Sequence, residues 1–161
     1  MVISEATSYS ILNLGNCDGV NTPMLKQHEI LFQPINIGPR TLKNRFYQVP
    51  HCTGMGYNLP QTHAAMRSVK AEGGWGAVCT EYCSISPDTD DAPYPFQTIW
   101  DDSDVKNLSM MVSGVHEYNS LAGIELLAGG SYVANMNVRR PALGAVSLQS
   151  AVEPLQSRAM D

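Results

Sequence analysis

One segment of the sequence, residues 75–83 (WGAVCTEYC), limits the possible folds more than any other. It is apolar almost throughout until Glu81, and the pair Gly73-Gly74 directly precedes it. A short continuous apolar run of this kind is typical of a parallel strand that is buried on both faces. Paired glycines commonly end a preceding helix. The segment therefore predicts a strand in the interior of a parallel sheet, and the glycine pair predicts that a helix precedes it.

Two further strands are predicted around this segment, at residues 46–49 and 121–127. Pro50 stops the first of them, because proline cannot donate a hydrogen bond to a sheet. Gly129 and Gly130 follow the second and indicate a turn. The sequence therefore predicts three strands, each followed by a loop.

Helical patterns lie in both connections between these strands. The first predicted helix has Thr62 as its cap and ends at the Gly73-Gly74 pair. The second begins at Asp101 and Asp102, whose negative charges suit a helix N-terminus. Its predicted apolar face consists of Val105, Leu108, Val112 and Val115. The order strand, helix, strand, helix, strand predicts an α/β fold with a parallel sheet and right-handed crossovers.

The remaining parts of the chain fall outside this alternation. Residues 1–27 show no sustained pattern and predict a poorly ordered extension, whereas residues 28–161 predict the folded domain. At the start of that domain, residues 30–40 predict a short hairpin that is closed by a Gly-Pro-Arg turn. The tail, residues 139–161, has no clear period and is predicted to be loop.

The length of the chain, 161 residues, limits how much of a sheet can form. A closed eight-stranded barrel takes about 250 residues. Three parallel strands without closure leave sheet edges open. The sequence therefore predicts either an open sheet of modest size or the first part of a larger fold.

The composition argues against several classes of function. The net charge of -5 and the pI near 5.2 provide no basic face for nucleic acid or an anionic membrane. No run of about 18 apolar residues is present to span a bilayer, and the first residues lack the features of a secretory signal. A cytoplasmic location is therefore expected, in which the 4 cysteines are thiols.

Residues with chemically active side chains follow each predicted strand. His51 and Cys52 follow the first strand, residues 81–83 end the second, and residues 125–130 end the third. In parallel α/β folds the functional groups gather at the carboxyl ends of the strands. We therefore expect these three clusters to lie on one rim of the sheet.

Two members of these clusters have both a functional and a structural explanation. A partly exposed thiol beside an imidazole could act as a nucleophile, but a single cysteine after a strand is commonly buried, and spacing alone favours burial of Cys52. Tyr82 could offer an aromatic face to a cation or a flat ring, or it could simply pack at the end of its strand.

The polar residues of the second strand also have both a functional and a structural explanation. Strict alternation places Cys79, Glu81 and Cys83 on one face. Cys79 and Cys83 could be two metal ligands, but no other Cys or His pair has zinc-like spacing, so no metal site is expected. Glu81 and Glu125 lie in apolar strands, where burial is costly without a partner. A structural salt bridge is the expected solution, and the available partners are Arg40, Arg45, Arg67 and Lys70.

Residues 49–52 (VPHC), 71–75 (AEGGW) and 80–83 (TEYC) form a distinctive set of motifs. With the sequence around them, they resemble the old yellow enzyme family, and most closely its trimethylamine dehydrogenase branch. The resembling segments are residues 28–56, 67–91, 99–108, 121–130 and 135–141. The resemblance implies the first half of a (β/α)8 TIM barrel, with about three to four βα units, preceded by a short hairpin.

The resemblance also implies an FMN cofactor at the carboxyl ends of the strands. In the branch, the cysteine of the VPHC motif is bonded through sulfur to the flavin ring, which makes Cys52 the corresponding attachment point. Glu125 matches a position near the pyrimidine edge of the flavin. The cofactor-binding residues implied in this way are Val49, Pro50, His51, Cys52, Glu81 and Glu125.

The implied function is that of an FMN-dependent oxidoreductase, in which hydride passes from an amine or from NAD(P)H to the flavin. Tyr82 would belong to an aromatic bowl that holds a substituted ammonium by cation-π attraction. Leu127 and Ala128 stand where branch members tend to have aromatic residues. The implied substrate is therefore a secondary or tertiary amine, or a methylated amino acid, rather than trimethylamine in particular.

The resemblance places the catalytic residues, the phosphate-binding end of FMN and the iron-sulfur cluster of full-length relatives beyond Asp161. No catalytic residue is therefore assigned within the chain, and the chain alone is expected to be inactive. The alternative is a non-catalytic half-barrel, either a remnant or an interaction module. Such a module would form a homodimer to cover its open edge strand.

Overall fold

The computed structural model describes residues 26–89, 95–133, 139–150 and 155–161. At its centre is a parallel sheet in the order β3-β4-β5, formed by Tyr47–Gln48, Ala77–Ser84 and Leu121–Leu127. In β4 every residue except Tyr82 is buried, which confirms the prediction from its apolar run. The predicted parallel arrangement is also confirmed, since β4 pairs in parallel with both neighbours.

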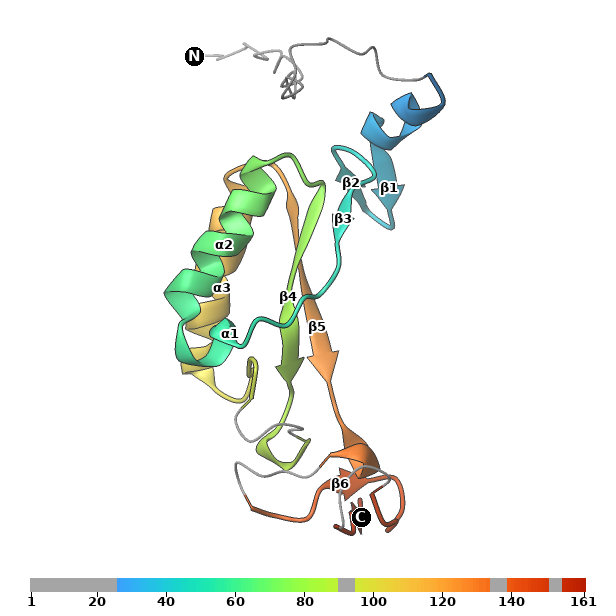
Figure 1. The fold of residues 1–161 in the computed structure, drawn as a ribbon, viewed down its shortest axis with the longest axis vertical. Helices are drawn as coiled ribbons and strands as arrows, with labels where there is room; N and C mark the ends of the chain where they lie inside the picture. Colours follow the sequence, from blue (N-terminus) through green and yellow to red (C-terminus); the bar gives the residue numbers. More distant parts are fainter. Residues whose placement is uncertain (1–25, 90–94, 134–138, 151–154) are drawn as a thin grey trace, which may run out of the picture.

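Two long helices, α2 (Pro60–Glu72) and α3 (Asp102–His116), lie side by side along one face of this sheet (Figure 1). Asp101 caps α3 as predicted, because its side chain accepts hydrogen bonds from the backbone nitrogens of Ser103 at 2.8 Å and Asp104 at 3.1 Å. The cap predicted at Thr62 is wrong. Pro60 already begins α2, since its fixed φ and missing N–H suit a first helical position.

The hydrophobic core lies between the helices and the sheet. It consists of Ala64, Ala71, Val78, Met111 and Val115, with Val112 and Ala122 packed against it. The apolar face predicted for α3 is correct for Leu108 and Val115 but wrong for Val105, which is 49% exposed. Met111 takes its place, because the face of α3 that contacts α2 and β5 follows positions 108, 111 and 115.

The predicted hairpin is present as β1 (Ile35–Ile37) and β2 (Arg40–Leu42), which pair antiparallel with Gly38 in its turn at φ 54°. Only glycine adopts such a φ at little cost. The hairpin begins later than predicted, because Lys26–Phe32 forms a 3₁₀ helix.

Two segments that were predicted to be loops contain regular structure. A short helix, α1 (Met55–Asn58), follows β3, and the tail forms β6 (Leu143–Gly144) and β7 (Arg158–Ala159), which pair in parallel. Such short elements have no periodicity that a sequence pattern can reveal. The predicted extension, residues 1–27, lies outside the described residues except for its last two. No helix in the described ranges combines the length and apolar character needed to cross a bilayer.

Candidate functional site

The loop between β3 and α1 carries the cysteine on which the sequence prediction is centred. β3 ends at Gln48, so residues 49–54 leave the sheet before α1 begins at Met55. Val49, His51 and Cys52 are exposed there, and Pro50 is half-buried. The burial of Cys52 that spacing favoured is therefore wrong, because this loop runs along the surface and leaves the residue exposed.

Glu81 of β4 holds the second half of this loop. Its side chain is fully buried, and its carboxylate accepts hydrogen bonds from Thr53 Oγ1, from the backbone nitrogen of Gly54 at 3.0 Å and from that of Met55 at 3.3 Å. The salt bridge predicted for Glu81 is absent among the described residues, whose ion pairs involve Asp88. Hydrogen bonds from the loop replace it, since a buried carboxylate needs donors rather than a particular cation.

Arg67 of α2 holds the first half of the loop. It is fully buried, and its Nη2 donates to the carbonyl oxygen of His51 at 2.6 Å while Nη1 donates to Gln48 Oε1 at 2.9 Å. Nε donates to His63 Nε2 at 3.0 Å. Burial lowers the pKa of Arg67, and the negative charge of Glu81 is the largest effect in the opposite direction. The two buried charges therefore hold the loop from both sides of Cys52.

His63 is the acceptor that completes the bonding of the guanidinium. Burial lowers its pKa to about 4, and the nearby positive charge of Arg67 adds to that effect. The imidazole is therefore neutral near pH 7, with Nε2 as the acceptor and the proton on Nδ1. Sequence reasoning missed His63 and Gln48, and it considered Arg67 only as a salt-bridge partner. Positions 64, 67 and 71 share one helix face, which is a signal for a buried arginine.

The strict alternation predicted for β4 is wrong. Its register against β5 shifts between Cys79 and Tyr82, and Cys83 Sγ lies 3.6 Å from Thr80 Oγ1. Cys79, Glu81 and Cys83 therefore do not share one regular face. Burial raises the pKa of the Cys83 thiol to about 11 and also raises that of Cys79. Both thiols are neutral near pH 7 and act as packing groups.

Two tyrosines lie at different ends of the sheet, Tyr82 near the carboxyl end of β4 and Tyr47 opposite Ala77 at its start. Tyr82 is half-buried and meets Phe96 edge-to-face, with ring centroids 5.1 Å apart. Tyr47 of β3 shares a hydrogen bond of 2.9 Å with the sulfur of Cys79, which is the main cause of a pKa raised to about 12. The structure thus brings Tyr82 to the same end of the sheet as the cysteine loop, as predicted.

Glu125 lies beside this cluster on β5, in register with Tyr82 of β4. It is exposed, and within the described ranges it takes part in none of the ion pairs that the sequence analysis expected. Its backbone nitrogen donates to Thr80 Oγ1 at 3.4 Å. Unlike Glu81, it therefore leaves its carboxylate available at the rim.

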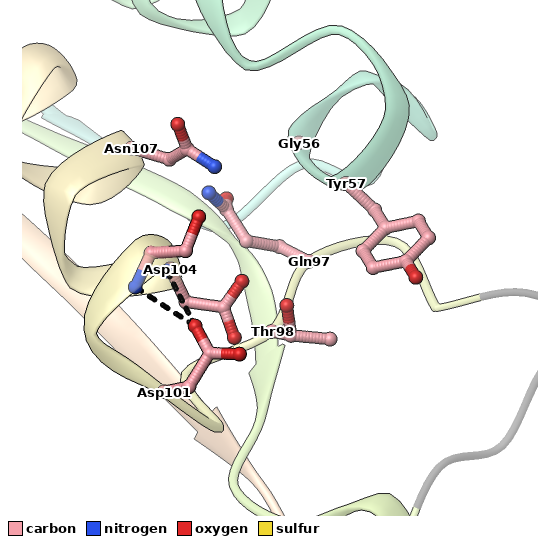
Figure 2. Close-up of a pocket in the computed structure, with 8 residues that line it drawn as sticks. Gly56, Tyr57, Gln97, Thr98, Asp101, Asp104 and Asn107 are labelled. Carbon is pink, nitrogen blue, oxygen red and sulfur yellow. Dashed lines mark hydrogen bonds between the residues drawn. The ribbon is translucent and has the colours of Figure 1, made fainter. Parts of the chain in front are cut away.

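A polar cavity of about 280 Å³ lies between α1 and the start of α3 (Figure 2). Gln97 Oε1 faces it and is buried without a hydrogen-bond partner among the described residues. A side chain at Gly56 would collide with that of Gln97 and displace it. None of the cofactor-binding or substrate-binding residues predicted from the sequence lines this cavity. It is lined by Gly56, Tyr57, Gln97, Thr98, Asp101, Ser103, Asp104 and Asn107.

Comparison with known proteins gives consistent matches. The model of the NADH:flavin oxidoreductase / NADH oxidase family matches residues 30–160. A dimethylamine dehydrogenase from Hyphomicrobium sp. (strain x) is 51% identical over 111 residues, which are 69% of this chain and 15% of that relative. The chain therefore spans about one seventh of the length of this relative.

Two solved structures agree with the fold. Histamine dehydrogenase from Rhizobium sp. 4-9 matches with a TM-score of 0.79 and 38% identity, over 84% of this chain and 20% of that one. The 6-hydroxypseudooxynicotine amine oxidase from Pseudomonas geniculata N1 matches with a TM-score of 0.77 and 37% identity, over the same shares. The predicted fold class, the first βα units of a TIM barrel after a hairpin, is confirmed, and the described residues do not close a barrel.

Proposed function

This chain belongs to the NADH:flavin oxidoreductase / NADH oxidase family, and we propose that it provides the part of a flavin-dependent oxidoreductase that binds one side of the FMN ring. The observation that supports this most is the loop after β3. It exposes Cys52 while Arg67 and Glu81 fix the backbone on either side. A cofactor attachment point needs this combination of an accessible thiol and a fixed backbone.

The residues at the rim fit a flat, partly apolar ring. Val49 is 58% exposed beside Pro50, so the start of the loop offers an apolar surface next to Cys52. In our proposal Val49, Pro50 and His51 line the ring, and Glu125 approaches its polar edge. Glu81 contributes indirectly, through the backbone that it holds.

Cys52 is the proposed attachment point. A thioether there would replace the S–H bond of the thiol and one C–H bond of the ring with a C–S bond. Two protons and two electrons would be released, and an external acceptor such as dioxygen would take up the two electrons. When bound, FMN supplies the hydride-accepting chemistry. The protein supplies the exposed thiol and the fixed loop. A cytoplasmic location is part of the proposal, because it keeps Cys52 available as a thiol.

The proposed substrate is an amine, since similar proteins are named for dimethylamine, histamine and an amine oxidase activity. Tyr82 and Phe96 present two aromatic rings at the rim, and aromatic faces attract substituted ammonium ions. NAD(P)H is the other hydride donor in our proposal, since NADH is part of the name of the family. Because the chain covers only a fifth of the matched structures, catalytic residues are proposed to lie on parts of the barrel that it does not include.

The covalent attachment is tested on the protein expressed from its complete gene. After precipitation with trichloroacetic acid, we expect the yellow flavin absorbance to remain in the pellet, and to move to the supernatant in Cys52→Ser. Cys83→Ser is the matched control, because Cys83 is buried and should leave the flavin in the pellet. Flavin that dissociates from the wild-type protein in acid would contradict the thioether.

A second proposal is that the chain dimerises through β5. Ile124 is 41% exposed and Leu126 is 64% exposed on this strand, which pairs only with β4 in the described sheet. Pairing of two such strands would cover both edges. Size-exclusion chromatography with light scattering tests this: a dimer that ignores added FMN supports the interaction module, and a monomer contradicts it.

A further inference from the structure

We propose that Arg67 and Glu81 are positioning residues that act on Cys52 with opposite electrostatic effects, Arg67 favouring its thiolate and Glu81 opposing it. These opposite effects on the thiol are distinct from the hydrogen bonds by which both residues hold the loop in place. The inference deepens the proposed function, because a thiolate is the form of cysteine that attacks an electrophilic carbon. The proposal itself concerns only the thiol.

Arg67 is placed to act through a single peptide group. Its Nη2 donates at 2.6 Å to the carbonyl oxygen of His51, and this carbonyl belongs to the peptide bond that joins His51 to Cys52. The guanidinium is fully buried, so solvent screens its charge weakly. A negative charge on Cys52 is among the influences that raise the pKa of Arg67. Because such an interaction is mutual, Arg67 must stabilise the thiolate of Cys52.

Glu81 lies on the other side of the thiol along the chain. Its buried carboxylate accepts hydrogen bonds from the residues that directly follow Cys52, Thr53 and Gly54 among them. A buried negative charge so close to a second one disfavours it. Glu81 therefore raises the cost of the thiolate by its charge while it fixes the loop by its hydrogen bonds.

The other titratable groups around the loop do not obscure this comparison. His63 on α2 has its pKa lowered to about 4 and is neutral near pH 7. Burial raises the pKa of the Cys79 thiol on β4, so it is neutral as well. Glu125 on β5 and His51 on the loop are present in every variant proposed below, so their effects cancel.

The test measures the thiol directly. The full chain is produced in a host starved of riboflavin, and the rate at which iodoacetamide alkylates Cys52 is followed from pH 5 to 10 by mass spectrometry of the peptide that contains it. Arg67→Gln and Glu81→Gln each remove one charge and keep a polar amide. We expect about a three- to tenfold slower reaction near pH 7 in Arg67→Gln and a similar acceleration in Glu81→Gln.

The signs of the two shifts decide between an electrostatic and a merely structural role. If both residues only held the loop, both substitutions would change the rate in the same direction, and that result overturns the proposal. Arg67→Lys keeps the charge without the fork of donors, and it should restore the wild-type pH midpoint even where stability is lower. If Arg67→Gln does not fold by circular dichroism, Glu81→Gln and Arg67→Lys still decide, because a midpoint that does not fall in Glu81→Gln contradicts the proposal.

The outcome is separate from that of the proposed function. Alkylation requires no flavin, so opposite shifts can occur in a protein that never retains flavin in acid, and then only the thioether fails. Conversely, the flavin can be acid-stable on Cys52 while both substitutions change the alkylation rate in the same direction. That result supports the thioether and contradicts the electrostatic roles of Arg67 and Glu81.

Discussion

Glu81 and Glu125 occupy the same place in two neighbouring apolar strands, yet their surroundings are opposite. Each is the fifth residue of its strand, β4 or β5. Glu81 is fully buried and holds the cysteine loop, whereas Glu125 is exposed. The register explains the difference: three steps along β4 from Cys79 to Tyr82 match two steps along β5 from Gly123 to Glu125. Because β4 contains one extra residue at this point, the side chain of Glu81 points to the other side of the sheet from that of Glu125.

This comparison separates structure from function at the rim. β4 lies between two strands and uses its carboxylate to organise a loop, while β5 has a neighbour on one side in the described sheet and leaves its carboxylate open. A substitution at Glu81 should therefore change stability and loop geometry. A substitution at Glu125 should affect only what binds there.

The largest expected effect is that of Glu81→Ala. It leaves the backbone nitrogens of Gly54 and Met55 without their acceptor and removes a negative charge that raises the pKa of Arg67, so we expect the free energy of unfolding to fall by about 3 kcal/mol. Urea denaturation measures it. Glu125→Ala is the matched control and should change stability by less than about 0.5 kcal/mol. Equal losses in the two variants would contradict the contrast between the strands.

The second effect is a pH dependence of stability that comes from His63 of α2, which accepts a hydrogen bond from Arg67. The pKa of His63 is about 4 in the folded chain, below its ordinary value near 6.5, so the unfolded chain binds a proton that the folded chain does not. Stability should therefore fall as the pH decreases from about 6.5 to 4, by about 2 kcal/mol. His63→Gln keeps an acceptor for Arg67 and should lose this part of the slope in urea titrations at each pH. An unchanged slope would show that His63 is not the group responsible.

A third effect tests the contact between the two strands. A Cβ at Gly123 of β5 would overlap the sulfur of Cys79 on β4, so Gly123→Ala should cost about 1 to 2 kcal/mol in thermal or urea unfolding. The double variant Gly123→Ala/Cys79→Ala should recover part of this loss, because the methyl group of alanine leaves room. Failure of the double variant to recover any stability would place the strain elsewhere.

The smallest effect is expected on the outer part of β5. Leu126 is 64% exposed, so Leu126→Thr should change the free energy of unfolding by less than about 0.5 kcal/mol in dilute solution. If β5 is a dimer interface, the same substitution should shift the elution volume toward the monomer. A large loss of stability without a change in oligomeric state would mean that β5 packs against parts of this chain.

The sequence predicted the sheet and its helices well where local pattern alone determines the structure. The strand at 121–127 and the Asp101 cap were correct because alternation with turns and capping chemistry are local. The extra residue in β4 carries no such signal, so the predicted face of Glu81 and its salt bridge were wrong. The bonding of Arg67 to Gln48 and His51 depends on how α2 packs against β3, which only the tertiary structure fixes.

The candidate site was predictable in its position but not in its organisation. The carboxyl ends of parallel strands and the VPHC and TEYC motifs placed Cys52 and Tyr82 at one rim. Exposure of Cys52 could not be predicted from spacing, because it depends on the tertiary contacts of Arg67 and Glu81 that hold the loop. The contribution of Glu81 through backbone nitrogens of the loop was likewise beyond any sequence motif.

Hydrogen exchange at the backbone nitrogens of Gly54 and Met55 tests most directly whether Glu81 holds the loop that presents Cys52. Both donate to the buried carboxylate, so nuclear magnetic resonance should find them strongly protected in the wild-type chain and in Glu125→Ala. In Glu81→Ala their exchange should accelerate by at least about tenfold more than that of the β4 amides. Rapid exchange at both positions in the wild-type chain would contradict the account.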